Sequence, residues 1–116
     1  MTSADQVKPV SFEKSDVGYM VKTSKQHFRW RLQLEGHLTT IEVLSSKLSG
    51  RRRILRDGIL IADKQQFEGS FVHTFSVLNH SLCVMQHGEH FELRIDNVSF
   101  SHLHAQEQTK SEFTFS

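Results

Sequence analysis

The chain lacks the residues that would place it in a covalent framework or a membrane. Among its 116 residues Cys83 is the single cysteine, so no disulfide can form within the chain. No apolar run approaches the roughly 20 residues that span a bilayer. The first residues, MTSADQVKPVSFEKSD, contain no apolar core of the kind found in a secretory signal. We therefore expect a soluble, cytoplasmic protein without a transmembrane segment.

The chain also lacks an excess of charge. Its formal net charge is +1, so no global positive field points to nucleic acid as a partner. Any local cluster of charge must then be judged by itself. A length of 116 residues supports one domain with one core.

Motifs for catalysis and metal binding are missing as well. The sequence has no glycine-rich phosphate loop, no CxxC and no HExxH. A nucleophilic Cys83 would need an exposed thiolate beside a base, but SLCVMQ reads as a buried strand. Zinc needs three or four converging ligands, whereas most histidines fall at expected strand ends and turns. We predict no catalytic residue, no metal site and no cofactor. The eight histidines are His27, His37, His73, His80, His87, His90, His102 and His104.

Two histidine placements are more specific. His73 falls on an inward-facing position of its expected strand, which favours a hydrogen-bonded core residue. The stretch His102-Leu103-His104 would put two imidazoles on one face of a strand.

What is present is a regular alternation of turns and strands. Turn signals such as EG at 35, SG at 49, DG at 57 and DN at 96 recur about every ten residues. Between them, HFRWRLQLE and HFELRID alternate apolar and polar side chains, as half-buried strands do. No segment sustains a period of 3.6, so helix should be scarce. The expected inward residues are Phe28, Trp30, Leu32, Leu34, Phe71, Phe75, Val77, Phe91, Leu93 and Ile95.

The sequence also contains two pairs of similar strand–turn–strand segments. RRILRDGILI (52–61) and FELRIDNVSF (91–100) both read strand, tight turn, strand, and so do WRLQLEGHLTTIEV (30–43) and TFSVLNHSLCVM (74–85). We predict an all-β fold, an antiparallel β-sandwich of about eight strands built from two similar four-strand halves. The sandwich would span residues 26–104. A polar N-terminal tail (1–25) and a polar C-terminal tail (105–116) would flank it.

The order of these motifs resembles a domain of the Fas apoptotic inhibitory molecule family. The resemblance covers roughly residues 28–103 and implies a compact eight-stranded antiparallel β-sandwich. It implies a non-enzymatic, intracellular protein that acts through protein contacts, in a family linked to restraint of death signalling and to protection against protein aggregation. The family's proteins in animals carry two such domains, and this chain shows one. Arg53 and Arg56 stand where the family tends to have apolar residues. The matching residues are Trp30, Gly36, His37, Ile41, Glu42, Ser49, Gly50, Arg51, Arg52, Asp57 and Gly58.

The stretch SGRRRILRDG (49–58) carries the one candidate binding site, Arg51, Arg52, Arg53 and Arg56. In one interpretation these charges guard an exposed edge strand against pairing with another sheet. In the other, their guanidinium groups bind carboxylates or phosphates of an acidic protein segment, a phosphorylated peptide or an anionic lipid head group. We expect a protein partner of unknown identity. Weak self-association also stays open.

Overall fold

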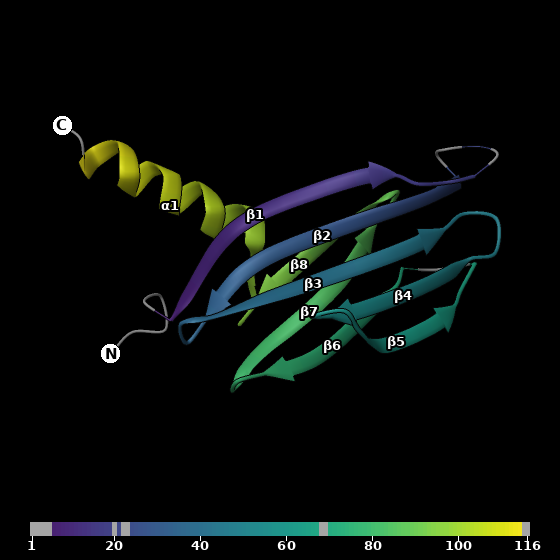
Figure 1. Cartoon of the computed structure of the whole chain (residues 1–116), viewed down its shortest axis with the longest axis horizontal. Helices are drawn as coiled ribbons and strands as arrows, with labels where there is room; N and C mark the ends of the chain where they lie inside the picture. The colour runs from purple at the N-terminus through teal and green to yellow at the C-terminus, as the bar shows by residue number, and fades with distance from the viewer. Residues whose placement is uncertain (1–5, 20, 22–23, 68–69, 115–116) are drawn as a thin grey trace.

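The chain folds into two antiparallel sheets and one helix in the computed structural model, which describes residues 6–19, 21, 24–67 and 70–114 (Figure 1). This confirms the prediction of a mostly antiparallel β protein with little helix. Strands follow one another within each sheet in chain order. The first sheet contains β1 (Val7–Asp16), β2 (Lys25–Leu34), β3 (His37–Ser46), β4 (Arg51–Arg56) and β5 (Ile59–Gln65). The second contains β6 (Val72–Val77), β7 (His80–His87), β8 (His90–Ile95) and β9 (Val98–Ser99), and α1 (Phe100–Thr114) follows.

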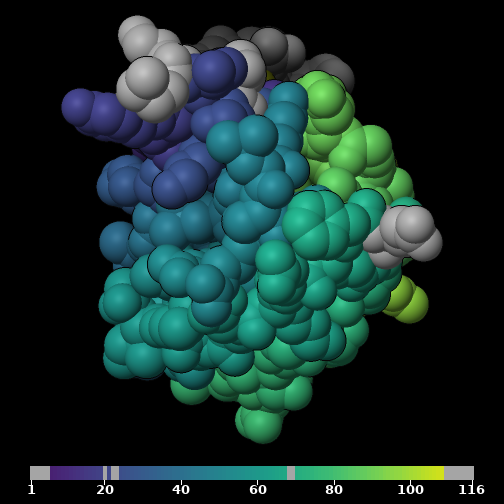
Figure 2. All heavy atoms as spheres, turned by 90° about the vertical axis from the view of Figure 1, so that its right-hand side faces the viewer, coloured from purple at the N-terminus to yellow at the C-terminus, as the bar shows by residue number. Residues whose placement is uncertain are grey.

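The core lies between the two sheets. Phe28 of β2 and Phe91 of β8 meet edge to face, with their ring centroids 5.0 Å apart. Buried apolar side chains of both sheets form one cluster, and Figure 2 shows the first sheet (purple to teal) and the second (green) as adjoining layers. The alternation in the sequence placed these strands correctly. Fully or nearly buried residues include the predicted Phe28, Trp30, Leu32, Leu34, Phe71, Val77, Phe91, Leu93 and Ile95.

Two predicted tight turns are confirmed by their backbone. Asp57 and Gly58 have φ angles of 50° and 82°, and Asp96 and Asn97 have 50° and 71°. Two successive positive φ angles belong to the hairpin turn whose twist matches that of the strands. The sequence therefore specified the β4–β5 and β8–β9 connections locally.

The predicted N-terminal tail needs correction. Residues 7–16 form β1, which pairs with β2 along its length, and Val7 is buried in the core. The register shifts between Pro9 and Ser11, so the alternation that reveals other strands is broken here. Beyond Pro9 the strand is mostly exposed, which makes its sequence resemble a tail. Residues 1–5, 20 and 22–23 of that predicted tail lie outside the described residues.

The C-terminal boundary also needs correction. Residues 100–114 form α1, which lies against β1 and the β8–β9 end of the second sheet (Figure 1). His102 and His104 therefore belong to a helix rather than to one strand face. Phe100 and Leu103 attach the helix to the core. Residues 115–116 lie outside the described residues, and within the described part no helix is long and apolar enough to cross a membrane.

Candidate anion-binding site

The arginine-rich strand β4 is an interior strand. It pairs with β3 on one side and with β5 on the other, and β5 ends the sheet. The interpretation that these arginines guard an exposed edge is therefore wrong, because their strand has no free edge.

The strand divides the four arginines among three environments. Arg52 shares the inward face with Ile54, whereas Arg51 and Arg53 point to the outer face of the first sheet. Arg56 lies five residues from Arg51, about 16 Å along a strand at 3.3 Å per residue. Its nearest carboxylate is that of Asp57, 3.8 Å away. The four residues consequently do not form one site.

Arg52 is a buried connection between the sheets. It is 9% exposed, and its Nε donates a hydrogen bond to Gln86 Oε1 on β7 at 3.3 Å. Its Nη1 donates to the carbonyl oxygens of Ser46 and Arg51, each at 3.4 Å. Its guanidinium also lies 6.0 Å from the centre of the Phe91 ring. Burial lowers the pKa of Arg52, and these contacts leave it a structural role rather than a place in a surface site.

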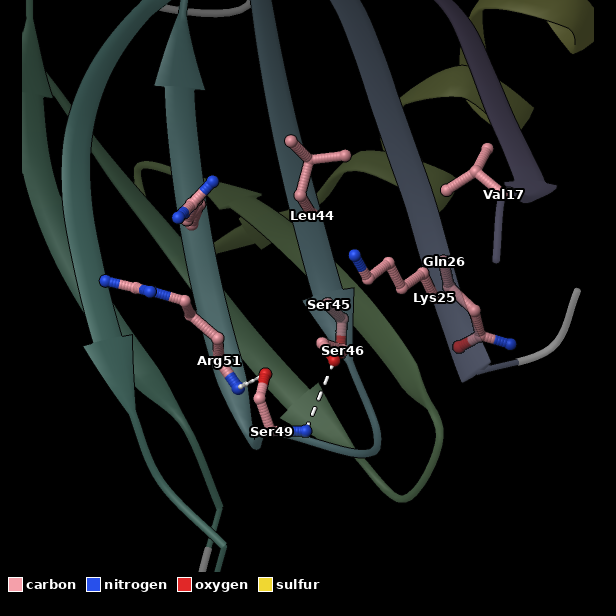
Figure 3. Close-up of a pocket in the computed structure, with 9 residues that line it drawn as sticks. Val17, Lys25, Gln26, Leu44, Ser45, Ser46, Ser49 and Arg51 are labelled. Carbon is pink, nitrogen blue, oxygen red and sulfur yellow. Dashed lines mark hydrogen bonds between the residues drawn. The ribbon is translucent and has the colours of Figure 1, made fainter. Parts of the chain in front are cut away.

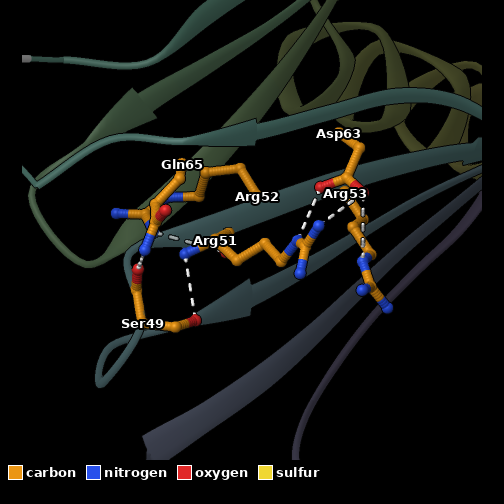
Figure 4. Close-up of polar contacts among 6 residues, drawn as sticks. All are labelled: Ser49, Arg51, Arg52, Arg53, Asp63 and Gln65. Atoms are coloured by element: carbon orange, nitrogen blue, oxygen red, sulfur yellow. Dashed lines mark hydrogen bonds and ion pairs between the residues drawn. The ribbon is translucent and has the colours of Figure 1, made fainter.

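Arg51 and Arg53 share one carboxylate. Arg51 donates two hydrogen bonds to the carboxylate of Asp63 on β5, from Nε at 2.8 Å and from Nη2 at 3.1 Å. This is the bidentate geometry typical of arginine–carboxylate pairs. Arg53 Nε lies 3.6 Å from the same carboxylate, while Arg52 points away from it (Figure 4). The hydrogen bond and the charge of Asp63 raise the pKa of Arg51, and the hydrogen bond from Arg51 lowers the pKa of Asp63.

Next to this pair lies a pocket of about 280 Å³ on the outer face of the first sheet (Figure 3). Strand pairing builds it, because Lys25 at the start of β2 stands opposite Ser46 at the end of β3. Leu44 provides an apolar surface between the lysine and β4. The pocket is lined by Val17, Lys25, Gln26, Leu44, Ser45, Ser46, Ser49, Arg51 and Arg53.

The pocket carries an excess of positive charge. Three cationic side chains line the pocket, and the carboxylate of Asp63 pairs with two of them, Arg51 and Arg53, whereas within the described residues Lys25 forms no ion pair. The hydroxyl oxygens of Ser46 and Ser49 accept hydrogen bonds from the backbone N–H groups of Ser49 and Arg51, both at 3.3 Å. Their O–H groups remain able to donate. The arrangement can therefore offer ammonium, guanidinium and hydroxyl donors to one anion.

A carboxylate lies on the outer face beside the pocket. Glu42 on β3 contacts His27 Nε2 at 2.6 Å and Arg29 Nε at 3.5 Å. Arg29 therefore already has a carboxylate partner, unlike Lys25 in the pocket.

The other candidate residues lie apart. Cys83 is half-buried on the outer face of the second sheet, opposite Arg94, and not in the apolar interior as predicted. His73 stacks between Phe71 and Phe75, and no hydrogen bond to it is seen in the described part of the chain. Burial, followed by the charge of Lys64, lowers the pKa of His73. Among the residues that the structure describes, no three His, Cys, Asp or Glu side chains gather as metal ligands would.

Sequence reasoning missed Lys25 and Ser46 as parts of the pocket, and Asp63 as the carboxylate that pairs with its two arginines. Lys25 was assigned to the tail, and only the β2–β3 register shows that it lies opposite Ser46. Comparison of the chain with family models, curated proteins and solved structures found no match.

Proposed function

We propose that the chain is a non-enzymatic protein-interaction module, and that its basic pocket receives an acidic segment of the partner. The observation that carries this proposal is the convergence of Lys25, Arg51 and Arg53 on one pocket with two hydroxyl groups and an apolar surface. Anionic groups pair with guanidinium and ammonium donors, while the apolar surface of Leu44 suits the carbon chain of a neighbouring residue. A cavity with both features fits a peptide segment that carries carboxylates or a phosphate.

We further propose that the fold is a β-sandwich of the Fas apoptotic inhibitory molecule type. Trp30 of the matching motif is nearly buried, and Asp57–Gly58 forms its tight hairpin turn. Each sheet also contains four consecutive antiparallel strands, β2–β5 and β6–β9, in keeping with two similar halves. Such a module would act in the cytoplasm through protein contacts. Roles in apoptosis regulation or in protection against aggregation follow from the family resemblance alone.

Two double variants with the same change in charge test the pocket. Lys25→Ser with Arg53→Ser removes two cations from the pocket, whereas Arg31→Ser with Arg56→Ser removes two from the same sheet outside it. Circular dichroism first confirms that both fold. The probes are a fluorescent glutamate-rich peptide, the same peptide with one phosphoserine, and vesicles containing an anionic lipid.

We expect the pocket variant to bind the acidic peptides at least about tenfold more weakly than the wild type, equivalent to 1.4 kcal/mol or more. The control variant should stay close to the wild type, and added salt should weaken binding of all three proteins. Equal losses in both variants would mean that only the overall charge matters. Binding to vesicles without binding to peptides would contradict a protein partner.

A further inference from the structure

The residues around the basic pocket stand in two rows across the first sheet. In the first row Lys25 of β2 is opposite Ser46 of β3, and the β3–β4 register brings Arg51 to the other side of Ser46. In the second row Leu44 of β3 is opposite Arg53 of β4. Neighbouring strands are about 4.8 Å apart, so β2 and β4 are separated by about 10 Å. Cationic side chains therefore approach the pocket from both sides of β3 (Figure 3).

Several donors in the pocket form no hydrogen bond with the residues that the structure describes. Arg51 already gives Nε and Nη2 to Asp63, but Arg53 comes only within 3.6 Å of that carboxylate, which is too long for a hydrogen bond. The guanidinium group of Arg53 therefore keeps its donors for a ligand, and the ammonium group of Lys25 adds three N–H groups. The hydroxyl group of Ser46 accepts from the backbone and can still donate.

The directions of these donors suit a phosphate better than a carboxylate. A carboxylate accepts hydrogen bonds mainly in its own plane. A phosphate group has three terminal oxygens that point in different directions, so it accepts from donors on opposite sides at once. Lys25 and Arg53 lie on either side of β3, and Ser46 lies on β3 between them. The pocket therefore matches an acceptor that is tetrahedral rather than planar.

The charge of the pocket favours the same group. The three positive charges of Lys25, Arg51 and Arg53, together with the negative charge of Asp63, leave a net charge of +2. One carboxylate would neutralise only half of that charge. A phosphate monoester carries about −1.5 to −2 near pH 7. A single phosphate therefore neutralises the pocket, whereas two carboxylates would be needed.

We propose that the acidic group of the partner is a phosphorylated serine or threonine with an apolar residue beside it. The inference rests on the proposed function and specifies the group that the pocket binds. Arg53 binds two phosphate oxygens as a fork and Lys25 contacts the third, because a guanidinium group matches phosphate geometry and an ammonium group acts as a point charge. The adjoining surface of Leu44 and Val17 contacts the apolar neighbour of the phosphorylated residue.

Three peptides of otherwise identical sequence test this choice in fluorescence anisotropy titrations near neutral pH. They carry phosphoserine, two glutamates or unmodified serine at the same place, so the first two have nearly equal charge. We expect the wild type to bind the phosphoserine peptide at least about tenfold more tightly than the two-glutamate peptide, because one additional charged hydrogen bond is worth that factor. Equal affinities would refute the preference for phosphate and leave the proposed function standing. No binding of either charged peptide would refute the proposed function itself.

A substitution that keeps the charge tests which residue holds the phosphate. Arg53→Lys loses the fork of donors, so it should weaken binding of the phosphoserine peptide at least about tenfold and change binding of the two-glutamate peptide little. Arg31→Lys is the matched control, because Arg31 lies on the same sheet outside the pocket and should alter neither affinity. Circular dichroism confirms that both variants fold. An unchanged preference in Arg53→Lys, or the same loss in Arg31→Lys, would overturn the assignment.

The same phosphate chemistry occurs in free phosphate and in lipid head groups, and two further measurements separate these sources. Inorganic phosphate should displace the phosphoserine peptide only at concentrations far above the Kd of the peptide, because it makes no apolar contact with Leu44. Vesicles containing phosphatidic acid should bind more weakly than the peptide. Displacement by phosphate at a matched concentration would overturn the peptide as the ligand. Tighter binding to vesicles that is lost in Arg53→Lys would do the same in favour of a membrane.

Discussion

His80 joins the two sheets through a pair of carboxylates. Its Nδ1 lies 2.6 Å from Asp96 Oδ2 in the β8–β9 turn, and its Nε2 lies 2.9 Å from Glu35 Oε1 in the β2–β3 turn. The imidazole is only 5% exposed. Because both ring nitrogens face acceptors, His80 donates to both carboxylates only as the imidazolium. We predict that His80→Gln destabilises the fold and that the loss depends on pH.

The size of the loss follows from the two contacts. A hydrogen bond to a charged group contributes about 1.5–3 kcal/mol. The side chains of Glu35 and Asp96 are 37% and 36% exposed, so water screens them and replaces part of what is lost. About 1 kcal/mol per contact, or about 2 kcal/mol together, is the expected decrease in the free energy of unfolding. For a chain of this length that lowers Tm by roughly 8 °C.

The sign of the pH dependence follows from two opposite shifts. The hydrogen bond to Asp96 raises the pKa of His80 against the effect of burial, and Glu35 adds to the increase. Burial opposes, but the hydrogen bonds from His80 and from the backbone of Ser81 lower the pKa of Asp96. The contribution of His80 is fully present below its ordinary pKa of 6.5 and disappears as pH rises through the raised value. That of Asp96 is present above its ordinary pKa of 3.8 and disappears as pH falls through the lowered value.

Urea denaturation followed by circular dichroism at several pH values measures the effect. The difference between the wild type and His80→Gln should be greatest between pH 3.8 and 6.5 and should shrink above and below that window. His37→Gln is the control, because His37 is an exposed histidine at the start of β3, in the same hairpin as Glu35. A difference that does not change with pH would refute the imidazolium link, and no difference at all would refute the structural role of His80.

Two further pairs of substitutions test the roles of the arginines and of a turn. Arg52→Met should lower the free energy of unfolding by about 1–3 kcal/mol because it removes three partly buried hydrogen bonds. Arg53→Met should change the free energy of unfolding by no more than about 0.5 kcal/mol. Urea denaturation compares the two variants, and equal losses would contradict a structural role that belongs to Arg52 alone. Gly50→Ala should cost more than Gly36→Ala in thermal denaturation. Both glycines have positive φ, but only at position 50 would the new Cβ meet atoms of the Phe67 ring at 3.0 Å. A smaller loss for Gly50→Ala would contradict the close contact.

Alternation in the sequence predicts best those strands that have one buried face and one solvent-exposed face. Phe28, Trp30, Leu32 and Leu34 alternate with polar residues because β2 lies between β1 and β3 with its inner face on the core. The prediction fails where that pattern is interrupted. In β1 the register shift at Pro9 breaks the alternation, and most of the strand is exposed. Proline is tolerated there because β1 is an edge strand of its sheet.

The helix was missed for a related reason. Helices that are recognised from sequence show an apolar stripe with a period of 3.6 residues. Among the side chains of α1 that the structure describes, only Phe100 and Leu103 pack against the core. The sequence of α1 contains no apolar stripe of that period. The sequence of such a helix cannot be distinguished from that of a polar tail.

The candidate site was predictable only in part. The sequence indicates that Arg52 alternates with Arg51 and Arg53, but not which face is buried. Gln86 and Phe91, which hold Arg52, come from strands more than 30 residues away. Asp63 and Lys25 reach the outer arginines only through the β4–β5 and β2–β3 pairings. The four arginines that are adjacent in the sequence therefore have three different roles in the fold. Arg52 is a buried structural residue, Arg51 and Arg53 line the pocket, and Arg56 lies beside Asp57 at the other end of β4.

The position of β4 inside the sheet explains how the outer arginines are held. Because β4 is an interior strand, Arg51 and Arg53 are fixed between two neighbouring ladders and can be oriented by Asp63 of β5. The same arrangement leaves β5 as the outermost strand of the sheet, with Asp63 paired to both arginines. One carboxylate on the outermost strand therefore orients both arginines of the basic pocket, and its effect depends on the β4–β5 pairing that sets it opposite Arg53.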